Sequence, residues 1–236
     1  MLTLFFVSDL PINIGSIYEF DSEDAHHAIK VLRITAGEKF MLSDGAGKWS
    51  EVKVFAVKKK SLEVEVLATG FQEPLLKTIT VVQAIPKGDR SKEAIELLTE
   101  AGADTIIPWA ASRSIGKGSE KFEVTAREAS KQSRRLRIPK ILETATTENI
   151  CSLISQSECV VVFHESAEKT LSDIELPQNA KDIVVIIGPE GGITPEELAR
   201  FQEAGAVLSR MGRPVLRSAH AGLAAVSALS SKLRVW

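Results

Sequence analysis

Four short apolar segments in the last two thirds of the chain limit its possible folds more than any other feature. They cover residues 78–85, 105–109, 159–163 and 183–187. Stretches with helical spacing of apolar residues separate them, such as residues 91–101, where Gly102 follows as a suitable helix end. Strands that are apolar on both faces and alternate with helices are typical of a parallel sheet covered by helices on both sides. The sequence therefore predicts an α/β domain.

Further helices of this domain are predicted by the same spacing. They cover residues 122–136, 194–204 and about 219–232. The second of them has the clearest start, because Thr194 can cap the helix, Pro195 fits its first position and Glu197 completes a capping box.

The first part of the chain has the pattern of a small β-structure. Residues 62–66 alternate between apolar and acidic side chains, as in a strand with one buried face. Asp44 and Gly45 mark a hairpin turn, and one helix is expected at residues 23–32. Closely spaced strands with glycine turns favour a small barrel. A segment of mixed polarity around residue 74 separates the two parts, so we expect domains at residues 1–73 and 74–236.

The composition says more about the cellular compartment and the kinds of partner than about the function. The chain has 236 residues and a net charge of −2, so nucleic-acid binding would have to rest on local basic patches. The two cysteines lack metal-ligand spacing, which argues against a metal site. A disulfide scaffold is not expected in a chain of this size with two cysteines, so a reducing compartment fits best. The sequence has no apolar run near the roughly 18 residues that cross a bilayer. We therefore expect a cytoplasmic protein with neither a membrane nor a metal partner.

The stretch IVVIIGPEGGIT, residues 183–194, places two glycine-marked turns at the end of a predicted strand. Ligands of parallel α/β sheets collect beyond the carboxyl ends of the strands, and glycines let a ligand approach the backbone. The loop is neither G-x-G-x-x-G nor a P-loop, and Glu190 would repel phosphates. A polar ligand that is not polyanionic, such as S-adenosylmethionine, fits better. Taken alone, the loop fits a tight turn without a ligand equally well.

Five segments together identify a resemblance. They are HHAIKVLR (residues 26–33), QAIPKGDRSKEAIELLTEAG (83–102), EASKQSRR (128–135), IIGPEGGIT (186–194) and MGRPVLRSAHAGLAAVSAL (211–229). In this order they resemble the bacterial 16S ribosomal RNA uracil-N3 methyltransferase family, of the SPOUT class of S-adenosylmethionine-dependent enzymes. The resemblance implies an N-terminal PUA-like β-barrel that binds RNA and a C-terminal SPOUT-type α/β domain with a trefoil knot. It also implies a homodimer that methylates N3 of a uridine in 16S rRNA of the small ribosomal subunit.

The resemblance assigns the cofactor, S-adenosyl-L-methionine, to three segments of the knot. The residues concerned are Phe163, His164 and Glu165, then Gly188, Pro189, Glu190, Gly191 and Gly192, and finally Met211, Gly212, Val215 and Leu216.

The resemblance also points to two candidate catalytic residues. Arg217 would stabilise the negative charge that develops on uracil when the N3 proton leaves, with a salt bridge in the knot as its alternative role. His220 is a candidate base, although a surface histidine at a helix start is an alternative that fits better. The family commonly has L-R-T-E-T-A where this chain has LRSAHA, so Ala219 replaces an acidic residue. The proton acceptor is therefore open at this point.

RNA contacts are expected from basic residues in three places: the barrel domain, the segment after the first strand of the α/β domain, and the charged run at residues 131–140. The candidates are Arg33, Lys87, Arg90, Arg134, Arg135 and Arg137. A charged run on a helix is more often a solvated face, so phosphate contact is one of two interpretations. Two other functions are kept open, namely a SPOUT methyltransferase for tRNA or another base, and a ribosome assembly factor that binds RNA without catalysis.

Overall fold

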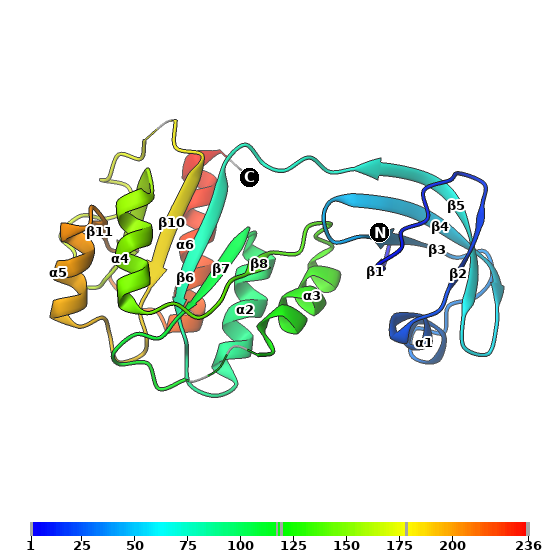
Figure 1. Ribbon diagram of the computed structural model, residues 1–236, viewed down its shortest axis with the longest axis horizontal. Coiled ribbons are helices and arrows are strands. Elements are labelled where there is room, and N and C mark those ends of the chain that lie inside the picture. Colours follow the sequence, from blue (N-terminus) through cyan, green and yellow to red (C-terminus); the bar gives the residue numbers. More distant parts are fainter. Residues whose placement is uncertain (1, 117, 119, 178, 235–236) are drawn as a thin grey trace. The chain divides into compact units, whose positions relative to one another are not determined.

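The computed structural model describes residues 2–116, 118, 120–177 and 179–234, and the chain divides into two compact units. The first contains Met1–Pro74 together with Ser130–Ile138. The second contains Leu75–Ala129 and Pro139–Trp236. Figure 1 shows the elements of each unit. No helix in the described ranges has the length and the apolar character needed to cross a membrane.

The first unit is a curled five-stranded sheet with one helix (Figure 1). Its elements are β1 (Leu4–Phe6), β2 (Ile17–Phe20), α1 (Glu23–Lys30), β3 (Lys39–Ser43), β4 (Lys48–Val57) and β5 (Leu62–Phe71). The strand order is β1-β3-β4-β5-β2, with β1 and β3 parallel and the other neighbours antiparallel. The predicted hairpin turn lies between β3 and β4, where the Asp44 carboxylate accepts hydrogen bonds from the amides of Ala46 and Lys48.

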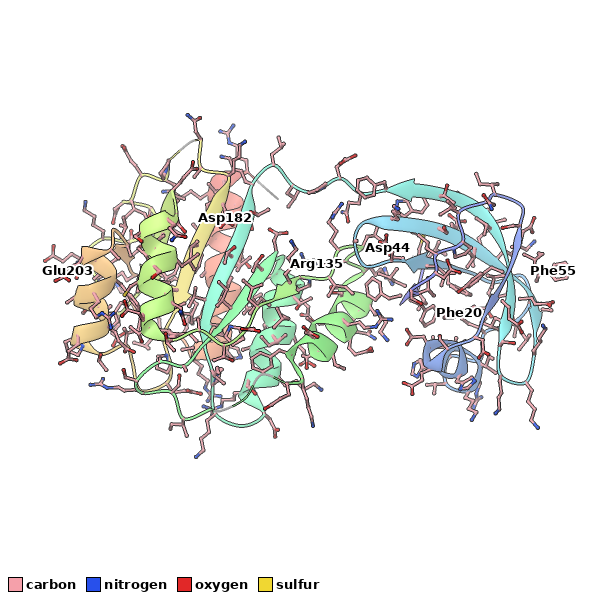
Figure 2. All side chains as sticks on the ribbon, in the orientation of Figure 1. Phe20, Asp44, Phe55, Arg135, Asp182 and Glu203 are labelled. Carbon is pink, nitrogen blue, oxygen red and sulfur yellow. The ribbon has the colours of Figure 1, made fainter. Side chains whose placement is uncertain are left out.

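Aromatic packing fills the core of this unit. The rings of Phe5, Phe20 and Phe40 have centroids 5.3 to 5.7 Å apart. Phe20 is fully buried, whereas Phe55 on β4 projects outward with 65% of its surface exposed (Figure 2). The alternation of buried and exposed residues along β4 and β5 is therefore that of strands with one buried face.

The segment Ser130–Ile138 is distant in sequence but belongs to the first unit. The ammonium of Lys131 lies 2.7 Å from the carboxylate of Asp24 on α1, and their side chains are only 11% and 18% exposed. The amide of Ile138 donates to the carbonyl of Gly45 at 2.9 Å. These contacts connect the segment to α1 and to the β3–β4 turn.

The second unit contains a six-stranded sheet with the order β11-β9-β10-β6-β7-β8, in which all neighbours are parallel. Its elements are β6 (Thr78–Ala84), α2 (Arg90–Ala101), β7 (Thr105–Trp109), α3 (Phe122–Ser133), β8 (Lys140–Ile141), α4 (Thr147–Gln156), β9 (Cys159–Phe163), β10 (Asp182–Ile187), α5 (Pro195–Glu203), β11 (Val207–Ser209) and α6 (Ser218–Leu233). The last residues of α3 fall in the first unit. The predicted parallel sheet is confirmed.

Helices cover both faces of this sheet (Figure 1). Ile150 and Ile154 of α4 and Phe201 of α5 join the strands in one apolar core. On the opposite face α6 packs against α2, β6 and β10. The contact is close at Gly222, where an added Cβ would lie 2.7 Å from Leu98 Cδ2 of α2. The short side chains of α6 therefore let two helices and a strand approach one another.

The structure corrects the end of one predicted helix and contains elements that the sequence did not predict. The helix expected to reach residue 136 ends at Ser133, because Arg134 has a left-handed backbone with φ of 59°. The sequence analysis also missed α4 and β11. The predicted helix start at Thr194 is confirmed, with Pro195 in the first turn and a capping box to Glu197.

The chain between β11 and α6 follows the connection between β9 and β10. The amide of Arg210 donates to the carbonyl of Lys169 at 2.9 Å, and the amide of Leu171 donates to the carbonyl of Arg210 at 3.2 Å. At the other end of α6, Lys232 Nζ donates to the carbonyl of Leu171 at 2.8 Å. The segment after β11 is thus bound to residues 169–171 before α6 begins.

Candidate active site

The connections at the carboxyl edge of the parallel sheet enclose a cleft of about 430 Å3. It is lined by Arg90, Phe163, His164, Glu165, Ile187, Gly188, Pro189, Glu190, Gly192, Ile193, Arg210, Met211, Gly212, Arg213, Pro214, Val215, Leu216, Arg217, Ser218 and Ala221. The glycine loop after β10 and the segment after β11 therefore meet in space, although a helix and a strand separate them in sequence. Every predicted cofactor residue except Gly191 lines the cleft.

The loop after β10 is a tight turn whose shape depends on glycine. The amide of Gly192 donates to the carbonyl of Pro189 at 2.9 Å. Gly192 has a φ of 75°, which residues other than glycine rarely adopt. At Gly188 an added Cβ would lie 2.7 Å from Cγ1 of Ile193. The turn thus brings backbone groups directly to the wall of the cleft.

Neighbouring connections hold this turn from outside the cleft. The carboxylate of Glu190 accepts a hydrogen bond from the amide of Lys87 at 3.3 Å. The guanidinium of Arg113 donates to the carbonyl of Gly191 at 3.0 Å, and a Cβ on Gly191 would lie 3.1 Å from Arg113 Cβ. Because Gly191 has no side chain, Arg113 can pack closely against the turn.

Glu197 anchors the helix that follows the turn. Its residue surface is only 3% exposed, and its carboxylate accepts hydrogen bonds from Ser112, Thr147 and Thr194. Burial by itself would raise the pKa of this carboxyl, but the hydrogen bonds from Ser112, Thr194 and Thr147 outweigh it and lower the pKa. A buried, ionised carboxylate thus joins α5 to the segment after β7 and to the first residue of α4.

His164 at the end of β9 has a defined ring orientation. Its amide donates to the carbonyl of Ser209 at 2.9 Å, and its Nδ1 accepts from the amide of Ser166 at 3.2 Å. In the neutral ring the proton therefore lies on Nε2, which is 3.7 Å from the carboxylate of Glu165. The segment after β9 thus presents an oriented imidazole and a carboxylate at the cleft.

The segment after β11 forms the most exposed wall. Val215 and Leu216 are 76% and 40% exposed although both are apolar. Arg217 follows at the start of α6 with an extended backbone, and its carbonyl accepts the amides of His220 and Ala221. Ser218 is buried and its hydroxyl donates to the carbonyl of Gly188 at 2.7 Å. The first residue of α6 is thus bonded to the first residue of the glycine loop.

The two predicted catalytic residues lie in different surroundings. Arg217 lines the cleft. His220 is not among the lining residues, and its Nε2 lies 3.3 Å from the carboxylate of Glu93 on α2, where both side chains are about half exposed. Ala219, at the position where an acidic residue is usual in the family, is buried.

The predicted RNA-binding residues have separate locations. Arg90 lines the cleft and Lys87 is exposed beside it, whereas Arg33 is exposed in the first unit with a φ of 55°. Arg137 donates two hydrogen bonds to the carbonyl of Gln72 and lies 5.1 Å from the centroid of a phenylalanine ring, so it has a structural role. The remaining two, Arg134 and Arg135, follow the end of α3, and Figure 2 labels Arg135 there.

Sequence reasoning did not single out several residues of the cleft. Arg210 and Arg213 are basic residues of the same segment as Met211, so their position in the run RMGRP was the available signal. Gln83 does not line the cleft. It belongs to the segment 83–102 that carries the resemblance, but a single glutamine in an apolar strand gave no signal of a role at the site. Its amide Nε2 donates to the hydroxyl of Ser218 at 3.0 Å. Among the described residues, no group of three histidine, cysteine or acidic side chains can hold a metal ion.

Known proteins resemble the chain over nearly its whole length. The family model of an RNA methyltransferase domain matches residues 72–230, and that of an RNA methyltransferase PUA domain matches residues 20–67. Ribosomal RNA small subunit methyltransferase E from Mycobacterium bovis is 36% identical, over 99% of this chain and 93% of that protein. The Bacillus subtilis protein of the same name is 28% identical, over 90% and 89%. A ribosomal RNA small subunit methyltransferase E from Neisseria gonorrhoeae, crystallised with S-adenosyl methionine, has a TM-score of 0.87 at 25% identity and covers 98% of each chain.

These similarities confirm the predicted fold class, with a PUA domain that has a curled sheet and a parallel-sheet domain of the SPOUT type. They also confirm the resemblance drawn from the five sequence segments. The chain belongs to the RNA methyltransferase family whose members include ribosomal RNA small subunit methyltransferase E.

Proposed function

We propose that the protein transfers a methyl group from S-adenosyl-L-methionine to N3 of a uridine in 16S rRNA of the small ribosomal subunit. The observation that supports this most is the meeting of Gly188–Gly192 and Met211–Leu216 at one cleft on the carboxyl edge of the sheet. Relatives named ribosomal RNA small subunit methyltransferase E and a structural neighbour bound to S-adenosyl methionine support the cofactor and the substrate class.

The lining of the cleft fits this cofactor. Its volume of about 430 Å3 lies within the usual range for small-molecule sites. Ile187, Ile193 and Leu216 offer apolar contacts for an adenine ring, and the glycine turn offers backbone hydrogen bonds. The carboxylates of Glu165 and Glu190 favour a ligand that carries positive charge.

The chemistry requires residues that position uracil and stabilise its anion. When bound, S-adenosylmethionine would supply an electrophilic methyl carbon; N3 would bond to this carbon, and the electron pair of the broken S–C bond would neutralise the positively charged sulfur. Arg217 at the rim of the cleft donates to a uracil oxygen and stabilises the charge that appears when the N3 proton leaves. His220 faces Glu93, so the structure supports the role of Arg217 more strongly than a role of His220 as base.

RNA binding is assigned to basic residues of both units. Arg90 and Lys87 lie at the cleft and just beside it, where they suit the nucleotide that enters. In the PUA unit, Arg33 and Arg134 are exposed and suit phosphate contacts. Arg135 follows Arg134, and Arg137 supports the segment through Gln72. A ribosomal substrate places the protein in the cytoplasm.

The homodimer is part of the same proposal. A second, more apolar groove of about 660 Å3 lies behind the segment after β11. Leu171, Pro214 and Leu216 line it together with the short side chains Ala224 and Ala228 of α6. A second copy of the chain is the occupant that we expect, because an exposed apolar surface of this kind marks a protein–protein interaction site.

The test is a methyl-transfer assay with labelled S-adenosylmethionine and small ribosomal subunits that lack this modification, followed by identification of the nucleoside. N3-methyluridine in 16S rRNA is the expected product. Modification of tRNA or of another base would contradict the proposed substrate. A protein that binds subunits and cofactor but transfers nothing would be an assembly factor, the alternative that Ala219 leaves open.

A further inference from the structure

One buried polar side chain stands out on the face of the sheet that α2 and α6 cover. Gln83 is 2% exposed and lies near the carboxyl end of β6, between Pro108 of β7 and Ile187 of β10 in the sheet register. The neighbouring strand residues are apolar. A buried amide costs free energy unless its hydrogen bonds are made, so its presence calls for a physical reason.

The amide of Gln83 begins a chain of directed hydrogen bonds. Nε2 donates to the carbonyl of Ala84 at 2.9 Å and to the hydroxyl of Ser218 at 3.0 Å. The hydroxyl of Ser218 in turn donates to the carbonyl of Gly188 at 2.7 Å. The orientation of the amide is determined, because a carbonyl can only accept and therefore requires Nε2 to face Ala84. Oε1 has no hydrogen-bond partner among the described residues.

The last bond of this chain, from Ser218 to Gly188, joins the two walls of the cleft. Gly188 is the first residue of the glycine turn, and Ser218 follows directly after the segment of Met211–Leu216 and Arg217. The hydroxyl of Ser218 thus links the two walls directly, and the amide of Gln83 holds this hydroxyl in place by donating a hydrogen bond to it.

The packing of α6 allows this geometry. Gly222 lies one turn after Ser218 on the same face of the helix, and an added Cβ there would be 3.1 Å from Gln83 Oε1. A larger residue would push α6 away from β6 and separate Ser218 from Gln83.

We propose that Gln83 and Ser218 are positioning residues that clamp the two walls of the cofactor cleft in their binding geometry before the cofactor arrives. The identity of the cofactor rests on the proposed function, but the clamp itself is a property of the free protein. A pre-formed cleft avoids the loss of conformational freedom that loose walls would suffer on binding, and this raises affinity. The clamp also orients Arg217, which immediately precedes Ser218.

A merely structural role makes a different prediction. An apolar side chain of similar shape at position 83 would remove the unpaired Oε1 and keep the packing, so stability would be equal or higher. A merely structural role therefore leaves the cofactor affinity of Gln83→Met unchanged. The clamp predicts that the unfolding temperature stays equal or rises while the cleft becomes looser and binds the cofactor less tightly.

The experiment compares Ser218→Ala and Gln83→Met with two controls. Ser218→Thr keeps the hydroxyl. Ser227→Ala removes another hydroxyl of α6, which donates to the carbonyl of Leu223 in its own helix. Amide hydrogen exchange of the free protein is followed over residues 186–194 and 211–218. Calorimetry then gives the affinity for S-adenosylmethionine.

We expect faster exchange in both segments and an affinity lowered about tenfold in Ser218→Ala and Gln83→Met, which corresponds to about 1.4 kcal/mol. Ser218→Thr and Ser227→Ala should match the wild type. Unchanged exchange in Ser218→Ala, or equal losses in Ser218→Ala and Ser218→Thr, would overturn the clamp. A wild-type protein that binds the cofactor but methylates no ribosomal RNA would contradict the proposed function alone, because the exchange and affinity measurements still decide the clamp.

Discussion

The carboxylate of Glu190 accepts a hydrogen bond from the backbone amide of Lys87, with 3.3 Å between Oε1 and the nitrogen. This contact joins the glycine turn after β10 to the connection between β6 and α2, which also carries Arg90. It gives the side chain between Pro189 and Gly191 a role as a hydrogen-bond acceptor for the neighbouring connection.

Replacing Glu190 should therefore weaken cofactor binding by loosening the turn. Glu190→Gln keeps an acceptor oxygen, whereas Glu190→Ala removes it. We expect Glu190→Ala to lower the affinity for S-adenosylmethionine about threefold to tenfold in calorimetry, the size of one exposed hydrogen bond, with a smaller loss in Glu190→Gln. Equal losses in both variants would point to the charge of Glu190 and not to its bond with Lys87.

Arg217→Ala should separate turnover from cofactor binding. Removal of a donor that stabilises developing negative charge lowers turnover about 100-fold. The affinity for S-adenosylmethionine should change little, since the neighbouring backbone stays in place. Arg217→Lys keeps the charge but loses the planar pair of donors, so an intermediate turnover is expected. A parallel fall of turnover and affinity in Arg217→Ala would show that Arg217 holds the cleft together instead.

His220→Asn tests the other predicted catalytic residue. Its imidazole lies 3.3 Å from Glu93 and outside the lining of the cleft. We expect turnover at saturating cofactor to stay within about twofold of the wild type, as for an exposed position. A large loss in His220→Asn, with a shifted pH profile and intact cofactor affinity, would instead restore His220 as the base.

Glu197 should make stability depend on pH in the acid range. Its pKa is lowered from the ordinary value of 4.5, so its contribution is fully present above that value and is lost as the pH falls through the lowered pKa. Glu197→Gln cannot accept all the bonds that the carboxylate accepts, so it should destabilise the protein by about 1–3 kcal/mol at neutral pH. Between pH 5 and 2 the Glu197→Gln variant should lose less stability than the wild type does. Glu196→Gln, an exposed neighbour, serves as the control in thermal unfolding.

Gly222→Ala tests the close approach of α6 to α2 and β6. The added Cβ would lie 2.7 Å from Leu98 Cδ2 and 3.1 Å from Gln83 Oε1, so the helix must move. Overpacking should destabilise the protein by about 1–3 kcal/mol, against a gain of about 1 kcal/mol from helix propensity. In a double-mutant cycle, Leu98→Ala should relieve part of this loss. Independent, additive effects would show that the two residues do not collide.

The sequence by itself determined the class of fold and the two segments that line the cleft. Apolar strands between helices require a sheet covered on both faces, and Thr194, Pro195 and Glu197 carry the helix start in their own side chains. These signals are local, so they can be recognised in the sequence without the tertiary structure. The cleft segments Gly188–Gly192 and Met211–Leu216 were predicted from the family resemblance that the ordered motifs carry, and residues of both line the cleft.

Only the tertiary structure decided which residues meet. Gln83, Ser218 and Gly188 are far apart in the chain, and their hydrogen bonds exist because β6, β10 and α6 pack together. In the same way the end of α3 at Ser133 follows from the left-handed backbone of Arg134, which helical periodicity does not reveal. Contacts between distant segments depend on packing and not on local propensity, and for that reason the sequence pattern located the cleft while the structure identified what holds it together.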